Sequence, residues 1–210
     1  DHLTDLNDVI TTHWVMNPQP STLPLFGPPG LRDVVDATLG ALAPDIRYRI
    51  AHHDDLTRPP TVEVTEVAPG DRFRVGHAEV RVAGTDHRPV EPTVAFRVEG
   101  DGHSVVLGGD GVPCGGLDEL CRGADAYVQT VIRDDLVRQV PNPRFQDIVD
   151  YHSTVEDAAR TAARAGVRTL VLTHYVPPMA PDQADDWRAF AAAHFSGEIV
   201  LGDDLTTIRP

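Results

Sequence analysis

Apolar side chains recur along this chain with two different spacings. Over residues 3–15 and 31–42 they follow one another every three or four positions, which is typical of amphipathic helices. Over residues 61–107 short runs rich in β-branched residues are separated by turn residues such as Pro69-Gly70, which is typical of strands joined by hairpins. The first half of the chain therefore predicts helices followed by a mostly antiparallel sheet.

The second half alternates between the two spacings. The box Ser153-Thr154-Val155-Glu156 has the S-x-x-E pattern of a helix start, and Gly166 stands where a C-terminal cap belongs. Pro44 is expected to end the second helix, leaving residues 45–60 as a loop, and residues 134–148 are expected to form a mobile excursion. We predict helices at 3–15, 31–42, 116–122, 153–165 and 183–194, and strands at 23–26, 61–67, 71–75, 79–84, 93–98, 104–107, 126–132, 168–173, 198–201 and 205–208. This order is typical of a layered α/β sandwich.

Length and charge narrow the class of protein. The chain has 210 residues, which suits a single domain, and its apolar runs are too short to cross a bilayer. Its net charge is -14 and all 18 basic residues are arginines, which weighs against tightly bound nucleic acid unless the arginines cluster. Cys114 and Cys121 are too few for a disulfide framework and lack zinc-finger spacing. We expect a cytoplasmic protein without a membrane partner.

Polar residues follow several of the predicted strands at the point where each strand ends. His87 follows the strand at 79–84, Asp110 follows the strand at 104–107, and His174 closes the apolar run 169–173. Asp1-His2 open the chain, and His152 precedes a predicted helix. Imidazoles with a few carboxylates are the ligands that zinc prefers, so we expect these residues to converge on a metal site. Six other histidines have ordinary surroundings and are left out of it: His13, His52, His53, His77, His103 and His194.

The order of these motifs resembles that of a known family. Asp-His, a lone His after a strand, Gly-Asp, His-Ser-Thr and Leu-Thr-His resemble the metallo-β-lactamase superfamily in its ribonuclease Z and arylsulfatase-like branch. The likeness covers nearly the whole chain and implies a four-layer αββα sandwich with mixed, mostly antiparallel sheets. The family's first motif is H-x-H-x-D-H, and Asp1-His2 match its last two positions. The resemblance thus implies that two further histidines and the N-terminal strands precede Asp1.

The resemblance also implies roles for the residues of the site. One divalent ion would be held by the two preceding histidines, His87 and Asp110, and a second ion by Asp1, His2, Asp110 and His174. Asp110 would bridge the two ions. A hydroxide shared between the ions would be the nucleophile, and Asp1 would act in catalysis by orienting it. Zinc is the expected metal, although manganese and iron accept the same ligands.

His152, in the His-Ser-Thr box, resembles the family's second catalytic residue. It would stabilise the developing oxyanion or protonate the leaving group. The alternative interpretation is that His152 only helps to cap the helix that it precedes.

The substrate is where the chain departs from the ribonuclease Z pattern. The interval between His87 and Asp110 has no room for the arm with which these enzymes grip tRNA, and Gln129-Thr130-Val131-Ile132 stands where they have His-Glu-Ala-Thr. The sequence therefore favours hydrolysis of a phosphodiester, sulfate ester or similar small anionic ester, with Arg133 or Arg138 meeting the anionic group. Two alternatives remain open: a tRNA 3′-processing endonuclease of the ribonuclease Z type, and a non-catalytic metal-binding relative. The family often pairs, so a homodimer is a further expectation.

Overall fold

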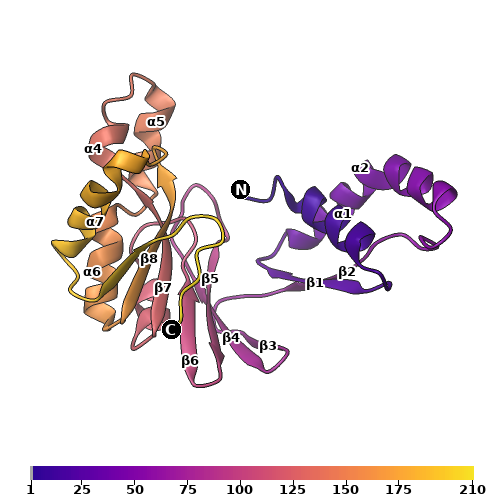
Figure 1. Cartoon of the computed structure of the whole chain (residues 1–210), viewed down its shortest axis with the longest axis horizontal. Helices are drawn as coiled ribbons and strands as arrows, with labels where there is room; N and C mark the ends of the chain where they lie inside the picture. Colours follow the sequence, from indigo (N-terminus) through magenta and orange to yellow (C-terminus); the bar gives the residue numbers. More distant parts are fainter. Residues whose placement is uncertain (1) are drawn as a thin grey trace. The chain divides into compact units, whose positions relative to one another are not determined.

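The computed structural model describes residues 2–210, and the chain divides into two compact units, residues 1–67 and 68–210 (Figure 1). The positions of the units relative to one another are not determined. Each is therefore described by itself, and the single-domain expectation stays a prediction. Asp1, which the sequence predicts as a metal ligand and catalytic residue, lies outside the described residues.

The first unit consists of two helices and two paired strands. Its elements are α1 (Leu6–Met16), β1 (Thr22–Gly27), α2 (Leu31–His52) and β2 (Thr61–Glu66). The two strands run parallel, with Leu25 opposite Val64. Leu31 and Val35 on α2 are buried with Val64, so the start of α2 is held by a small apolar cluster of its own.

Helix α2 corrects the expectation that Pro44 ends it. The helix continues to His52, and the predicted loop 45–60 is helical over its first half. Proline removes one backbone hydrogen bond, but the eight residues that follow contain no helix breaker, and Arg49 pairs with Asp45 at 2.7 Å one turn apart. Although α2 has 22 residues, no helix within residues 2–210 is both long and apolar enough to cross a membrane.

The second unit is built on a seven-stranded mixed sheet, ordered β3-β4-β5-β6-β7-β8-β9. The pairs from β3 to β6 are antiparallel, and those from β6 to β9 are parallel. Because β6, β7 and β8 are parallel, their carboxyl ends lie at one edge of the sheet. The strands are β3 (Arg72–Val75), β4 (Ala78–Gly84), β5 (Val94–Gly100), β6 (His103–Leu107), β7 (Ala126–Ile132), β8 (Thr169–Val176) and β9 (Glu198–Leu201).

Helices α3 (Gly115–Cys121), α6 (Val155–Ala165) and α7 (Ala184–Ala192) pack against this sheet, and Figure 1 shows α6 and α7 together beside β7 and β8. The core between the sheet and these helices is well buried. At most 1 % of the surface is exposed at Val106, Tyr127, Leu170 and Trp187. The α/β layered class predicted from the sequence is confirmed. The apolar spacing of each helix and strand gives that element one apolar face, and these faces pack together as layers.

Three local predictions are corrected. The capping box of α6 is formed by Thr154 with Asp157, one position later than predicted, while Gly166 caps the helix with a φ of 70° as expected. Residues 134–148, for which no helix was predicted, contain α4 (Asp134–Val137) and α5 (Pro143–Asp147), followed by the 3-10 turn η1 (Ile148–Asp150), and their mobility stays a prediction. Asn142 caps α5 by accepting from the Arg144 amide, and η2 (Pro181–Gln183) precedes α7. Residues 205–208 form no strand.

Asp125 fixes the edge of the sheet opposite to the site. Its carboxylate accepts from the backbone N–H of Ser104 at 2.6 Å and from the Ser104 hydroxyl at 3.1 Å, and it pairs with Arg168. Burial would raise the pKa of Asp125, but the two Ser104 hydrogen bonds and the Arg168 charge outweigh burial and hold it below its ordinary value. The folded protein therefore favours the ionised form of this carboxyl group.

We expect Asp125→Asn to lower the free energy of unfolding at pH 7 by about 1–2 kcal/mol, since charged hydrogen bonds are lost. A lowered folded pKa contributes stability above the unfolded pKa of about 3.9, and that contribution is lost as the pH falls through the folded value. The free energy of unfolding of the variant should therefore fall less than that of the wild type as the pH drops below about 4. Chemical denaturation at pH 7 and pH 3, with chelator present, measures both effects; Asp185→Asn, at a fully exposed position, is the control. Equal stability at pH 7 would contradict the role of Asp125.

Candidate metal centre

Four of the predicted site residues meet at one edge of the second unit. His87 lies in the turn after β4, Asp110 in the turn after β6, His152 just before α6, and His174 within the last part of β8. His87, Asp110 and His152 each offer a ligand atom, and these atoms lie within 4.8 Å of one another. His2 belongs to the first unit, so its predicted role stays a prediction.

Glycines shape the turn that carries Asp110. Gly109 has a φ of 70° and Gly111 a φ of 149°, both of which other residues rarely adopt. A Cβ at Gly111 would lie 2.7 Å from the Asp86 carbonyl oxygen, which instead accepts a hydrogen bond from Val112 at 2.8 Å. The turn can therefore sit against the segment that leads to His87.

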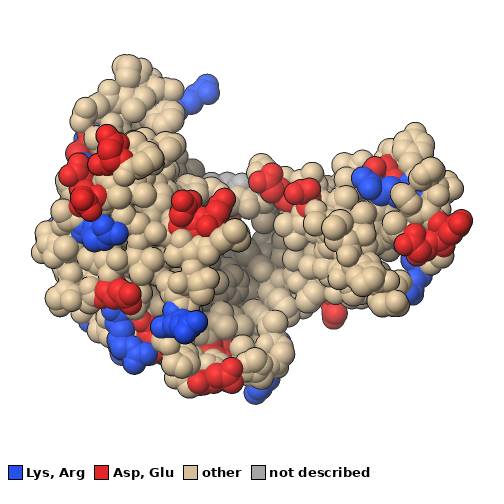
Figure 2. Space-filling model, viewed as in Figure 1, with Lys and Arg blue, Asp and Glu red and all other residues tan. Residues whose placement is uncertain are grey.

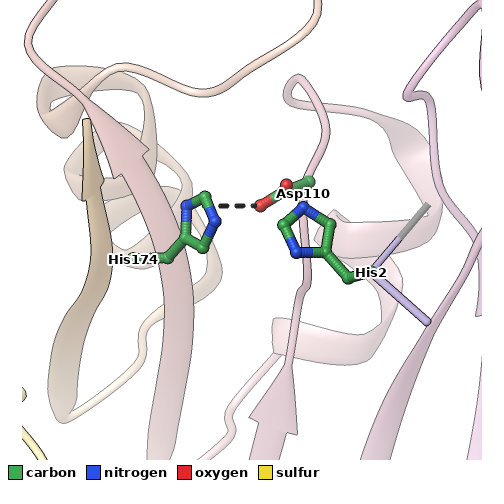
Figure 3. A group of neighbouring side chains, drawn as sticks. All are labelled: His2, Asp110 and His174. Carbon is green, nitrogen blue, oxygen red and sulfur yellow. Dashed lines mark ion pairs between the residues drawn. The ribbon is translucent and has the colours of Figure 1, made fainter. Parts of the chain in front are cut away.

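His174 is aimed by an irregularity in β8. Thr130 is opposite Thr173 and Ile132 is opposite Val176, so two residues of β8, His174 and Tyr175, face one residue of β7. This is a β-bulge, and His174 takes a left-handed φ of 50° within it. Its Nδ1 lies 4.0 Å from Asp110 Oδ1, and Figure 3 shows the imidazole facing that carboxylate. Backbone strain of this kind is a recurrent feature of functional sites.

His87 is 2 % exposed and held in one orientation. Its Nδ1 is 2.9 Å from the carbonyl oxygen of Tyr151. A carbonyl can only accept a hydrogen bond, so Nδ1 carries the proton and Nε2 of the neutral ring carries the lone pair. A hydrogen bond that fixes the tautomer in this way is characteristic of metal-binding histidines.

His152 is oriented by the same kind of contact. Its Nδ1 donates to the Ile148 carbonyl at 2.9 Å, and its Nε2 lies 3.4 Å from Asp110 Oδ2. The Ile148 carbonyl thus fixes the orientation of the His152 ring. The cap of α6 is made by Thr154, so capping does not account for His152.

His152 and His174 act on the charge of Asp110, whose side chain is 5 % exposed. Burial would raise the pKa of Asp110, but hydrogen bonds from His152 and Thr130 and the charges of His174 and His152 outweigh burial and hold it well below its ordinary value. For His152, burial would lower the pKa, but Asp110 and the Ile148 carbonyl raise it above its ordinary value. The centre therefore keeps a buried carboxylate ionised among imidazoles.

This set of donors fits a divalent cation. Asp110 presents an ionised carboxylate, and His87 presents an Nε2 lone pair fixed by its Tyr151 contact. One carboxylate with several imidazoles is the chemistry that zinc and comparable metals select. Beside His174 lies an open hollow of about 350 Å³, which also borders Thr173, Met179 and Asp203.

The two arginines that the sequence offered to an anionic substrate have structural contacts. Arg133 is buried, pairs with Asp135 at 2.7 Å and stacks over Phe190 with 3.9 Å to the ring centroid. Arg138 pairs with Asp134 at 3.3 Å. Arg133 is therefore corrected from a substrate contact to a packing residue, because Asp135 pairs with its charge and Phe190 stacks on the plane of its guanidinium group.

Sequence reasoning missed the residues that hold the centre together. Ser153, predicted as a helix cap, instead donates to the Gly111 carbonyl at 2.6 Å. Gln129 is fully buried and donates to the Gly109 carbonyl at 2.8 Å. A signal for Gln129 was present, since a large polar side chain within an otherwise apolar strand needs a buried partner.

Comparisons with known proteins match the part of the chain that carries these residues. A family model described as "Beta-lactamase superfamily domain" matches residues 1–175. Ribonuclease Z of Mycobacterium bovis (strain BCG / Pasteur 1173P2) is 57 % identical over 211 residues, which cover 100 % of this chain and 75 % of that protein. Ribonuclease Z of Mycolicibacterium gilvum is 56 % identical over 211 residues, covering 100 % and 74 %.

Solved structures share the fold at lower identity. The short form of human tRNase Z has a TM-score of 0.63 and 21 % identity, covering 97 % of this chain and 73 % of that one. The metallo-beta-lactamase fold protein YhfI from Bacillus subtilis has the same TM-score and identity, covering 95 % and 68 %.

Proposed function

This chain belongs to the beta-lactamase superfamily as a metal-dependent hydrolase, and from that premise we propose that it is an RNA endonuclease of the ribonuclease Z type that removes 3′ extensions from precursor tRNA. The observation that carries the proposal is the convergence of His87, His152 and His174 on Asp110. A carboxylate among imidazoles suits metal-assisted hydrolysis of an ester, and the names of the relatives above 50 % identity direct the choice of substrate to RNA.

The geometry of the centre assigns different roles to its residues. His87, Asp110 and His174 would hold the divalent cations, together with the predicted ligands Asp1 and His2. Cations held there would supply positive charge for the scissile phosphate and would favour ionisation of water at neutral pH. The His152 ring, pinned at Nδ1 by Ile148, presents Nε2 to the centre and can protonate the departing ribose oxygen.

The acidic composition is compatible with an RNA substrate. Figure 2 shows acidic and basic side chains interspersed over the visible face of the second unit, and no broad basic patch stands out among the described residues there. A net charge of -14 weakens general attraction for phosphates, whereas cations bound at the centre would supply positive potential at the scissile group. The sequence favoured a small ester because of the missing arm, the altered His-Glu-Ala-Thr box and the acidic charge, whereas the names of the relatives favour the ribonuclease Z alternative.

The test is cleavage of a precursor tRNA with a 3′ extension by the whole protein, supplied with Zn²⁺ or Mn²⁺. We expect cleavage at the 3′ end with a kcat/KM of about 10⁴ M⁻¹s⁻¹ or more, within the usual range for enzymes. Bis(p-nitrophenyl) phosphate and an aryl sulfate, assayed in parallel, should react far more slowly. Prior removal of metal with a chelator should abolish cleavage, and re-addition should restore it.

Two results would contradict the proposal. Rapid turnover of a small ester with the precursor left intact would support the small-ester interpretation. Metal binding without hydrolysis of any of these substrates would support a non-catalytic relative.

A further inference from the structure

The two peptide carbonyls that flank Asp110 are both held by side chains. The Gly109 carbonyl accepts from Gln129 Nε2 at 2.8 Å and from Thr130 Oγ1 at 2.9 Å. The Gly111 carbonyl accepts from Ser153 Oγ at 2.6 Å. Because Asp110 lies between these two carbonyls, its backbone is fixed from both sides.

Gln129 stands out among these contacts because its surroundings dictate which way its amide points. Nε2 also lies 3.0 Å from the Thr130 carbonyl, so the NH₂ group faces two acceptors. Oε1 accepts from the hydroxyl of Tyr127 at 2.6 Å, and both side chains are buried. Rotating the amide would place oxygen against two carbonyl oxygens and leave Oε1 without its donor, so only one orientation satisfies the site.

The absence of a side chain at Gly108 makes this arrangement possible. A Cβ at Gly108 would lie 2.1 Å from Gln129 Oε1 and 3.1 Å from Tyr127 Cε2. The backbone of Gly108 instead donates to the Val128 carbonyl at 3.0 Å. The turn that carries Asp110 thus rests directly on the Tyr127–Gln129 pair of the neighbouring strand.

We propose that Gln129 is a positioning residue: its amide, oriented by the Tyr127 hydroxyl, fixes the Gly109 carbonyl and thereby holds the Asp110 carboxylate where it can ligate a metal. Gln129 touches neither substrate nor metal and acts only through the turn. The inference rests on the metal role of Asp110 proposed above. It gives a function to the first position of Gln129-Thr130-Val131-Ile132, the segment that departs from the family's box.

The test is Co²⁺ binding by Gln129→Met, which keeps the volume and apolar stem but removes both polar groups. We expect Co²⁺ affinity to fall roughly 10–100-fold, the usual effect of removing a partner that supports a metal ligand. The visible absorption of bound Co²⁺ should also change, because a displaced carboxylate alters the ligand field. Tyr127→Phe should weaken binding less, since the amide keeps its acceptors but loses the group that orients it.

Ser104→Ala is the matched control. It removes the hydrogen bond that the Ser104 hydroxyl donates to the Asp125 carboxylate and the one that it accepts from the Asp125 N–H, at the other end of β6, so it should lower the unfolding temperature without changing Co²⁺ affinity. A drop in stability shared by both variants, with weaker Co²⁺ binding only in Gln129→Met, separates positioning from general stabilisation. Thr130→Val removes the second donor to Gly109 together with the Thr130 hydrogen bond to Asp110, and Thr130→Ser restores the hydroxyl; binding should weaken in the first and recover in the second.

Unchanged Co²⁺ affinity and spectrum in folded Gln129→Met would overturn the inference. If that variant does not fold, unchanged affinity in Thr130→Val and Tyr127→Phe would overturn it equally. Should the wild-type protein bind no Co²⁺, this inference and the proposed function would both fail, whereas normal wild-type binding with insensitive variants would remove this inference alone.

Discussion

Replacing Asp110 by Ala is expected to remove bound metal and lower the rate of RNA cleavage by at least about three orders of magnitude. The carboxylate lies close to His87, His152 and His174, so its loss leaves these imidazoles without the charge that balances the cations. Losing several kcal/mol of charge stabilisation corresponds to roughly 10³-fold or more in rate. Metal analysis of the dialysed protein and a cleavage assay measure the two effects.

Two further variants, Asp110→Asn and Asp185→Ala, serve as comparisons for this experiment. The amide keeps the shape and one oxygen of the carboxylate but no charge, so it should retain less metal than the wild type and more than Asp110→Ala. Asp185 is an exposed acid at the start of α7, and its replacement should leave metal and rate unchanged. If Asp110→Ala keeps two ions per chain, the bridging role predicted from the family resemblance is wrong.

Replacing His152 by Ala is expected to lower turnover by about two to four orders of magnitude, the usual scale for an acid-base or oxyanion group. Metal content should be unchanged, because the ring is assigned to the substrate and not to the ions. Added imidazole should restore part of the rate by filling the space that the side chain leaves. Turnover, metal analysis and imidazole rescue together test this assignment.

His103→Ala serves as the control for His152, since His103 is exposed at the start of β6 and should be silent. Helix α6 should survive the loss of His152 because Thr154 makes the cap. Loss of an ion from His152→Ala would instead make His152 a metal ligand, a role its place beside His87 and Asp110 permits. Full turnover would leave it no part in the chemistry.

The sequence alone indicated the α/β class, the family and four of the centre's residues. Each of these depends on local pattern: a buried strand reads as an apolar run, and the polar residue that ends it is set apart from that run. His87, Asp110 and His174 were found in this way, since strand ends at one edge of a sheet are brought together by the fold. The motif order then supplied the family, which the comparisons confirm.

Only the tertiary structure decided how those residues are held. Ser153 lies in a correct helix-start pattern, yet Thr154 makes the cap, because the Gly111 carbonyl offers Ser153 a buried acceptor 42 positions away in sequence. Gln129 reads as an ordinary strand residue until Tyr127 and the Gly109 carbonyl are placed around it. Periodicity records which face of an element is apolar, whereas the partner of a buried polar group is set by distant segments of the chain. That is why the convergence of these residues could be predicted from the sequence and their supports could not.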